Sequence, residues 1–112
     1  MCLFCKIAAK QIPAKIVIED DDLIAFHDVN PVAPTHVLVI PKAHLGSLSE
    51  GKEEHTALLG KLLLAAARAA ELAGVAKGGY RVVTNTGAHA GQSVAHLHLH
   101  VLGGRPMAWP PG

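Results

Sequence analysis

The chain has 112 residues, which fits a single domain, residues 1–112, built around one hydrophobic core. Half of the residues are hydrophobic, only 4% are aromatic, and the formal net charge is +1 at pH 7. This charge balance argues against nucleic acid, or any strongly charged macromolecule, as the main partner.

Neither a membrane span nor a signal peptide is indicated. The longest apolar run, residues 62–67, is too short to cross a bilayer. Residues 1–5 lack the charged region and the long apolar stretch of a secretory signal. We therefore expect a cytoplasmic protein with no membrane association.

The first third of the chain predicts a short helix and a hairpin. Residues 3–10 can form a helix, which must end before Pro13 because proline disfavours helical geometry in the residue preceding it. The β-branched segment 15–19 predicts a strand, residues 20–22 a turn, and residues 23–27 the returning strand.

Three further strands follow. Two prolines make residues 30–34 a loop, and the apolar segment 36–40 predicts a strand that Pro41 ends. Residues 80–85 and 94–102 predict two more strands, joined by a loop that contains glycines.

A long helix is predicted in the middle of the chain. Residues 47–50 are a plausible capping region, acidic residues follow near the positive end of the helix dipole, and Gly74 is a natural end. Paired strands interrupted by one long helix predict an α+β domain, with helices on one face of an antiparallel sheet. Apolar residues at helical spacing predict one buried stripe: Leu58, Leu59, Leu62, Leu63, Ala66, Ala69, Ala70 and Ala73.

Three histidines alternate with apolar residues in the last predicted strand. Since neighbouring strand residues point to opposite faces, His96, His98 and His100 would share one face. The outer two Cα atoms would lie about 13 Å apart, too far for all three imidazoles to bind one metal ion without strain. Because histidine titrates near neutral pH, one imidazole could attack while a neighbour donates a hydrogen bond. The alternative is a solvated polar strand face.

The loop before these histidines offers groups that suit an anion. Glycine lets the backbone approach phosphoryl oxygens, and Asn85 and Ser93 add side-chain donors. Any hairpin turn uses the same residue types, so the loop alone does not establish a phosphate site.

Residues 91–105, GQSVAHLHLHVLGGR, resemble the signature of the histidine triad nucleotide-binding family. Residues 12–15, 25–28, 33–36, 39–42 and the final Trp-Pro-Pro-Gly are similar to its Hint branch, so the resemblance covers almost the whole chain. It implies a five-stranded antiparallel sheet with one long and one short helix, extended across a homodimer. The tail, residues 103–112, would lie near the partner subunit's site.

The resemblance also implies the chemistry. His98 would attack the α-phosphorus of an AMP or GMP phosphoramidate and form a nucleotidyl-histidine, which water then hydrolyses. His100 would donate to a phosphoryl oxygen, Ser93 would contact the leaving group, and His96 and His36 would support the triad.

Further positions match the family's substrate contacts. Asn85, Gly91 and Gln92 would orient phosphate together with Ser93, His98 and His100, and Asp28 would accept from the ribose hydroxyls. Five positions match the purine pocket: Phe4, Ile7, Phe26, Val29 and Leu38. Without the resemblance those five are ordinary core residues, and Asp28 is a turn residue.

Cys2 and Cys5 have the Cys-x-x-Cys spacing of metal and redox sites. By resemblance to microbial family members, they would join His44 and His96 around zinc, and two thiolates with two imidazoles suit a tetrahedral zinc ion. Two metal-free thiols are the alternative, because Cys2 adjoins a terminus that can fray. No organic cofactor is implied.

The resemblance favours an enzyme, a purine nucleoside 5′-phosphoramidate hydrolase. Hydrolysis of dinucleoside polyphosphates is an alternative activity, but the Trp-Pro-Pro-Gly tail favours the phosphoramidate. The non-enzymatic alternatives are a nucleotide-binding interaction module with vestigial hydrolysis and a zinc-bearing scaffold. The intact set of Asn85, Ser93, His98 and His100 argues against vestigial chemistry.

Overall fold

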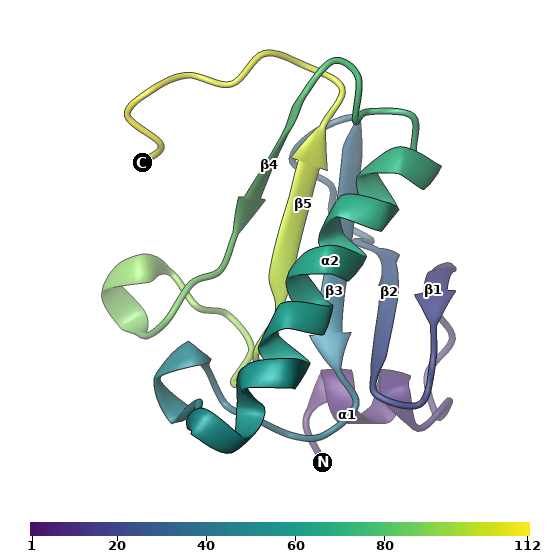
Figure 1. Cartoon of the computed structure of the whole chain (residues 1–112), viewed down its shortest axis with the longest axis vertical. Helices are drawn as coiled ribbons and strands as arrows, with labels where there is room; N and C mark the ends of the chain where they lie inside the picture. Colours follow the sequence, from purple (N-terminus) through teal and green to yellow (C-terminus); the bar gives the residue numbers. More distant parts are fainter.

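The computed structural model describes all residues, 1–112, as one sheet with a long helix across it (Figure 1). The five strands are antiparallel and lie in the order β1-β2-β3-β5-β4. This confirms the predicted α+β class, with one long and one short helix. The bounds are α1 (Leu3–Ala8), β1 (Ile16–Glu19), β2 (Leu23–His27), β3 (Thr35–Pro41), α2 (Thr56–Leu72), β4 (Tyr80–Val83) and β5 (Leu99–Gly103).

The predicted hairpin is formed by β1 and β2. Its turn is closed by the Asp20 carboxylate, which accepts hydrogen bonds from the backbone N–H groups of Asp22 and Leu23 at 2.7 and 3.0 Å. An aspartate that bonds the backbone two residues on is a common way to fix such a turn. β2 then pairs with β3 along its whole length, from Leu23 opposite Pro41 to His27 opposite Val37.

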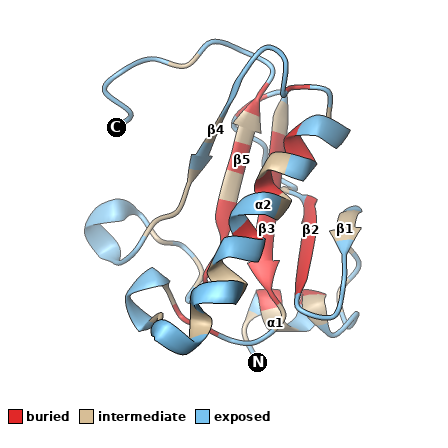
Figure 2. Cartoon of the chain, in the orientation of Figure 1, coloured by how far each residue is buried: buried red, intermediate tan, exposed pale blue.

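The main core lies between α2 and one face of the sheet. In Figure 2 the buried residues, coloured red, gather on the central strands behind α2. The inward face of α2 is small apart from Leu62, because Ala66, Ala69 and Ala70 are fully buried. Small side chains let the helix axis approach the strands closely. From the sheet, this core takes alternate residues of β2, β3 and β5: Leu23, Ala25, Val37, Val39, Leu99 and Val101.

The other sheet face is covered by α1, so the prediction that the helices lie on one face of the sheet was wrong. Phe4 and Ile7 of this short helix pack on a second cluster formed by the remaining alternate residues. That cluster contains Ile24, Phe26, Leu38 and Ile40. The register places His100 opposite Leu38, so the imidazole of His100 belongs to the α1 side of the sheet.

The long helix begins later than predicted. Ser47 caps a separate 3-10 turn by accepting from the Ser49 N–H at 3.2 Å, and Gly51 and Lys52 are extended, so the α-helix starts only at Thr56. Within the predicted stripe, Leu63 is 59% exposed because it points away from the sheet, next to the buried Leu62. The predicted end at Gly74 is confirmed, with a φ of 77°.

The last strand is shorter than predicted and begins at Leu99 instead of residue 94. The β3–β5 ladder ends at the pair Val39–Leu99, and continuing it would require a backbone N–H from Pro41, which has none. The Leu97 N–H donates instead to the Leu45 carbonyl at 2.6 Å. β4 likewise ends at Val83, short of the predicted residue 85.

None of the helices combines the length and the apolar character that crossing a membrane requires. The tail after β5 runs back past the exposed edge strand β4 (Figure 1). It is held there by Arg81, whose Nη2 donates to the Ala108 carbonyl at 2.9 Å and whose guanidinium lies 6.0 Å from the Trp109 ring centre.

Candidate active site

A cavity of about 480 Å³ opens on the α1 side of the sheet. All five predicted base-pocket residues line it, and four of them are buried: Phe4, Ile7, Phe26 and Leu38. The fifth, Val29, stands 89% exposed at the rim. An apolar cavity with a few polar groups at one end is the usual form of a small-molecule site.

Asp28, His36, Ser93 and His100 supply the polar end of this cavity. The His36 Nδ1 accepts from the backbone N–H of Val32 at 3.1 Å, so the proton of neutral His36 is on Nε2. Nε2 lies 2.8 Å from Nδ1 of His100 and 3.4 Å from the Asp28 carboxylate. His100 therefore accepts on Nδ1, and its Nε2–H is left to donate to a ligand.

Burial keeps these histidines uncharged. It lowers the pKa of His36, against the opposing effect of Asp28. Burial, together with the neighbouring His98 and His36, lowers the pKa of His100 to about 4. Asp28, His36 and His100 form a compact group of possible metal ligands, but the facing nitrogens of the two histidines already share a hydrogen bond. The arrangement therefore suits hydrogen-bond donation better than metal binding.

His98 packs beside His100 and is only 3% exposed. Its Nδ1 is 2.6 Å from the carbonyl oxygen of His96, which can only accept, so Nδ1 carries the proton and Nε2 carries the lone pair. The ring is held edge-on by Phe4 and His100, each with its centre 5.0 Å away. This is the tautomer that a nucleophilic imidazole requires.

The predicted phosphate loop is only partly available to a ligand. Ser93 is exposed and lines the cavity, whereas Asn85, Gly91 and Gln92 do not. The Gly91 N–H donates to Ala88 and the Gln92 N–H donates to Gly87, both at 3.1 Å within the loop. Both backbone N–H groups are therefore used within the loop in this structure, and contact of Gly91 and Gln92 with phosphate stays a prediction.

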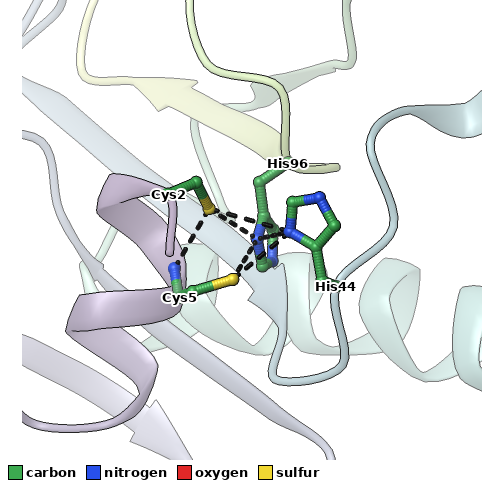
Figure 3. A group of neighbouring side chains, drawn as sticks. All are labelled: Cys2, Cys5, His44 and His96. Atoms are coloured by element: carbon green, nitrogen blue, oxygen red, sulfur yellow. Dashed lines mark hydrogen bonds between the residues drawn. The ribbon is translucent and has the colours of Figure 1, made fainter.

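The three histidines do not share one strand face, contrary to the prediction. Only His100 belongs to β5; His96 and His98 lie in the irregular segment before it. The fully buried His96 points toward the N-terminus of the chain, where it meets Cys2, Cys5 and His44 (Figure 3). Each of these four side chains offers a donor atom, all within 4.8 Å of one another.

The donors of this cluster converge on one point. Nδ1 of His96 lies 3.2 and 3.5 Å from the sulfurs of Cys2 and Cys5, and Nδ1 of His44 lies 3.7 and 3.3 Å from them. The Nε2–H of His96 donates to the Pro41 carbonyl at 2.9 Å, so its Nδ1 presents a lone pair to the sulfurs.

These separations match the edges of a zinc tetrahedron. Zinc–sulfur bonds of about 2.3 Å and zinc–nitrogen bonds of about 2.0–2.1 Å place sulfur and nitrogen about 3.6 Å apart and two nitrogens about 3.3 Å apart. The two Nδ1 atoms here are 3.1 Å apart. Burial raises the pKa of Cys5. Burial also acts to raise the pKa of Cys2, but hydrogen bonds from the Cys5 N–H and other neighbours outweigh it and lower that pKa.

Several contributors to the site carry no sequence signal. The carbonyls of Pro41 and Leu45 and the amide of Val32 act through the backbone, which any residue type supplies. Thr84 donates its hydroxyl to the His98 carbonyl at 2.9 Å, in place of the strand ladder that stops at Val83. Further cavity residues, such as Ile12 and Val94, are ordinary core positions by pattern.

Comparison with known proteins gives one consistent result. The family model of the HIT domain matches residues 9–107. An uncharacterised HIT-like protein of Synechococcus elongatus is 54% identical over 110 residues, covering 98% of this chain and 96% of its own. A purine nucleoside phosphoramidase of Escherichia coli K12 is 45% identical over 105 residues, covering 94% and 88%. The crystal structure of a HIT family hydrolase from Legionella pneumophila superposes with a TM-score of 0.97 at 47% identity and covers both chains completely.

Proposed function

The chain belongs to the HIT domain family, and from that premise we propose that it hydrolyses purine nucleoside 5′-phosphoramidates to nucleoside monophosphates. The observation that carries the proposal is the protonation of the triad. His100 lines the polar end of the cavity with a free N–H, and the ring of His98, which has a free lone pair, packs against it with the two ring centres 5.0 Å apart.

The reaction proceeds in two displacements. Nε2 of His98 forms a bond to the α-phosphorus while the phosphorus–nitrogen bond to the amine breaks, and the amine leaves with a proton taken from solvent. Water then attacks the same phosphorus and gives a proton back to solvent as the bond from phosphorus to His98 breaks, which releases the nucleoside monophosphate and restores His98. The Nε2–H of His100 donates to a non-bridging oxygen as negative charge develops there. Ser93, exposed at the cavity, contacts the leaving amine.

The cavity favours a purine nucleoside without selecting the base. Phe4, Phe26 and Leu38 line the cavity and would give apolar contact to a flat ring, and the Asp28 carboxylate, which also lines it, would accept from ribose hydroxyls. The buried part of the wall offers no hydrogen-bonding edge that separates adenine from guanine. We therefore propose that both AMP and GMP phosphoramidates are substrates.

The test is hydrolysis of adenosine 5′-phosphoramidate by the wild type, by His98→Ala and by His89→Ala. His89 is an exposed histidine outside the cavity, so it is the matched control. AMP release that His98→Ala abolishes and His89→Ala retains supports the proposal. A dinucleoside polyphosphate assayed alongside separates the two hydrolase activities. Tight AMP binding with no turnover of either substrate would favour the nucleotide-binding module.

We also propose that Cys2, Cys5, His44 and His96 hold a structural Zn²⁺. The tautomer of His96 and the spacing of the four donors support this, since converging lone pairs repel unless a cation lies between them. The bound ion would fix its ligands in place. Metal analysis of protein purified without chelators should find about one zinc per chain, and Cys5→Ser should lose most of it. A zinc content near zero in the wild type would refute the site.

Finally, we propose a homodimer in which the tail, residues 103–112, reaches toward the partner's site. The edge strand β4 is unpaired on its outer side, and Val82 and Leu64 expose apolar surface. Sedimentation or light scattering should give twice the 11.7 kDa mass of one chain. A monomer at assay concentration would contradict this.

A further inference from the structure

The nucleophile is carried by a segment that the sheet does not hold. β4 ends at Val83 and β5 begins at Leu99, so residues 84–98 have no strand partner. Both Ser93 and His98 belong to this segment. Loops without ladder bonds depend on individual side chains for their shape, and catalytic geometry tolerates little displacement.

Gln92 makes three hydrogen bonds with its side chain, all to backbone groups. Its Oε1 accepts from the Gly87 N–H at 2.9 Å, and its Nε2 donates to the carbonyls of Gly46 and Val94 at 2.7 and 2.9 Å. One amide thus closes the loop on itself and ties it to the segment that follows β3. Both hydrogen-bonding atoms of the side chain, Oε1 and Nε2, are thus engaged by backbone groups of the protein.

The connection to Gly46 reaches both parts of the site. Leu45, the preceding residue, accepts the Leu97 N–H, and His44 belongs to the four-donor cluster. Gln92 therefore ties the middle of the segment to residues 44–46, the same stretch of chain that holds Leu97 near the end of the segment. Ser93 follows Gln92 directly, and His98 follows Leu97.

We infer that Gln92 is a positioning residue: it holds residues 84–98 in the shape that places Ser93 and His98 against the substrate phosphate, without binding phosphate itself. This inference deepens the proposed hydrolase function and rests on it only for the identity of the phosphate ester or amide. The effect of Gln92 on the shape of residues 84–98, which we call its bracing role, is a property of the folded chain and can be measured without a substrate.

Two substitutions separate bracing from other roles. Gln92→Met keeps the length of the side chain and removes all three bonds. Gln92→Glu keeps the acceptor for Gly87 but turns a carboxylate toward two carbonyls that need donors. Gln11→Met and Gln11→Glu are matched controls, since Gln11 is exposed and its side chain makes no hydrogen bond. Each variant is assayed for kcat and KM on adenosine 5′-phosphoramidate, for AMP affinity, and for amide hydrogen exchange.

We expect kcat to fall about 10-fold in Gln92→Met and further in Gln92→Glu, while the AMP dissociation constant changes less than about 2-fold. Exchange should accelerate across 84–98 and stay unchanged in β5. The Gln11 variants should behave as wild type. If Gln92→Glu does not fold, the methionine variant decides.

An unchanged kcat with unchanged exchange in Gln92→Met would overturn the inference. So would AMP affinity that falls in step with kcat, because Gln92 would then be a phosphate ligand. If the wild type turns over no phosphoramidate, the proposed function fails, and the exchange measurement alone decides for Gln92. Faster exchange confined to 84–98 then supports the bracing role, and unchanged exchange refutes it.

Discussion

Mild acid should destabilise the protein through His100. Burial, with the neighbouring His98 and His36, holds the pKa of this imidazole at about 4, and only the Asp28 carboxylate opposes the shift. In the unfolded chain the same group has a pKa of about 6.5. Between these values the unfolded chain binds a proton that the folded chain does not. The free energy of unfolding is therefore highest above pH 6.5 and falls as the pH is lowered toward 4.

The size of the loss follows from proton linkage. One group that titrates at about 6.5 when unfolded and at about 4 when folded removes roughly 2 kcal/mol of stability between about pH 7.5 and about pH 5. This is an upper value, because His100 lines a cavity open to solvent, which screens its charge. Burial also lowers the pKa of His36 and His96, so they add to the loss with the same sign.

The assay is urea unfolding over this pH range for two proteins. The parent carries Cys2→Ser and Cys5→Ser, and the variant carries the same two substitutions together with His100→Gln. The cysteine substitutions remove any contribution from protons that compete with a metal. His89→Gln, at an exposed position, is the control. The His100→Gln protein should lose up to about 2 kcal/mol less than its parent between about pH 7.5 and about pH 5. Equal losses in the two proteins would refute the assignment.

Three further outcomes are expected. Leu62→Ala should cost about 2–5 kcal/mol of stability in a urea titration, with unchanged AMP affinity, because Leu62 of α2 is buried in the core on the sheet face away from the cavity. Leu63→Ala, at the exposed position beside it, should cost less than about 0.5 kcal/mol in the same titration. Phe4→Leu should weaken AMP binding measured by calorimetry, because the aromatic ring is lost from the cavity wall. It should lower the free energy of unfolding by less than about 1.5 kcal/mol, because most of the apolar volume stays. Equal AMP affinity would contradict the base pocket. Removing residues 109–112 should alter kcat/KM among phosphoramidates with different leaving amines and barely change Tm, because Trp109 is 81% exposed; identical kinetics on all amines would contradict this role for the tail.

The elements that periodicity alone determines were predictable. The alanine and leucine stripe of α2 identifies a helix with one buried face, and the β-branched segment of β1, followed by a turn and the apolar segment of β2, identifies a hairpin. Leu63 fits the spacing of the stripe and is nevertheless exposed, because the pattern gives the spacing of the buried residues but not the width of the buried face. That width depends on how much of the helix the sheet covers.

The bounds of the histidine strand were not predictable from its alternating pattern. A strand extends only as far as its neighbour can pair, and Pro41, 58 positions before Leu99, ends the ladder. The same event turns His96 toward Cys2, at the opposite end of the chain. The residues that meet in the cluster could be proposed only through the family resemblance, because nothing in local sequence brings them together.

The short helix α1 connects the parts of the site. Six residues are too few for a stable isolated helix, so α1 depends on its contacts with the rest of the chain. Its Phe4 forms the cavity wall and touches His98, while Cys2 and Cys5 face the imidazole of His96. The carbonyl of that same His96 accepts the Nδ1 proton of His98. The docking of α1, the shape of the base pocket and the tautomer of the nucleophile are therefore set by one continuous group of contacts, which explains why residues so distant in sequence must be correct together.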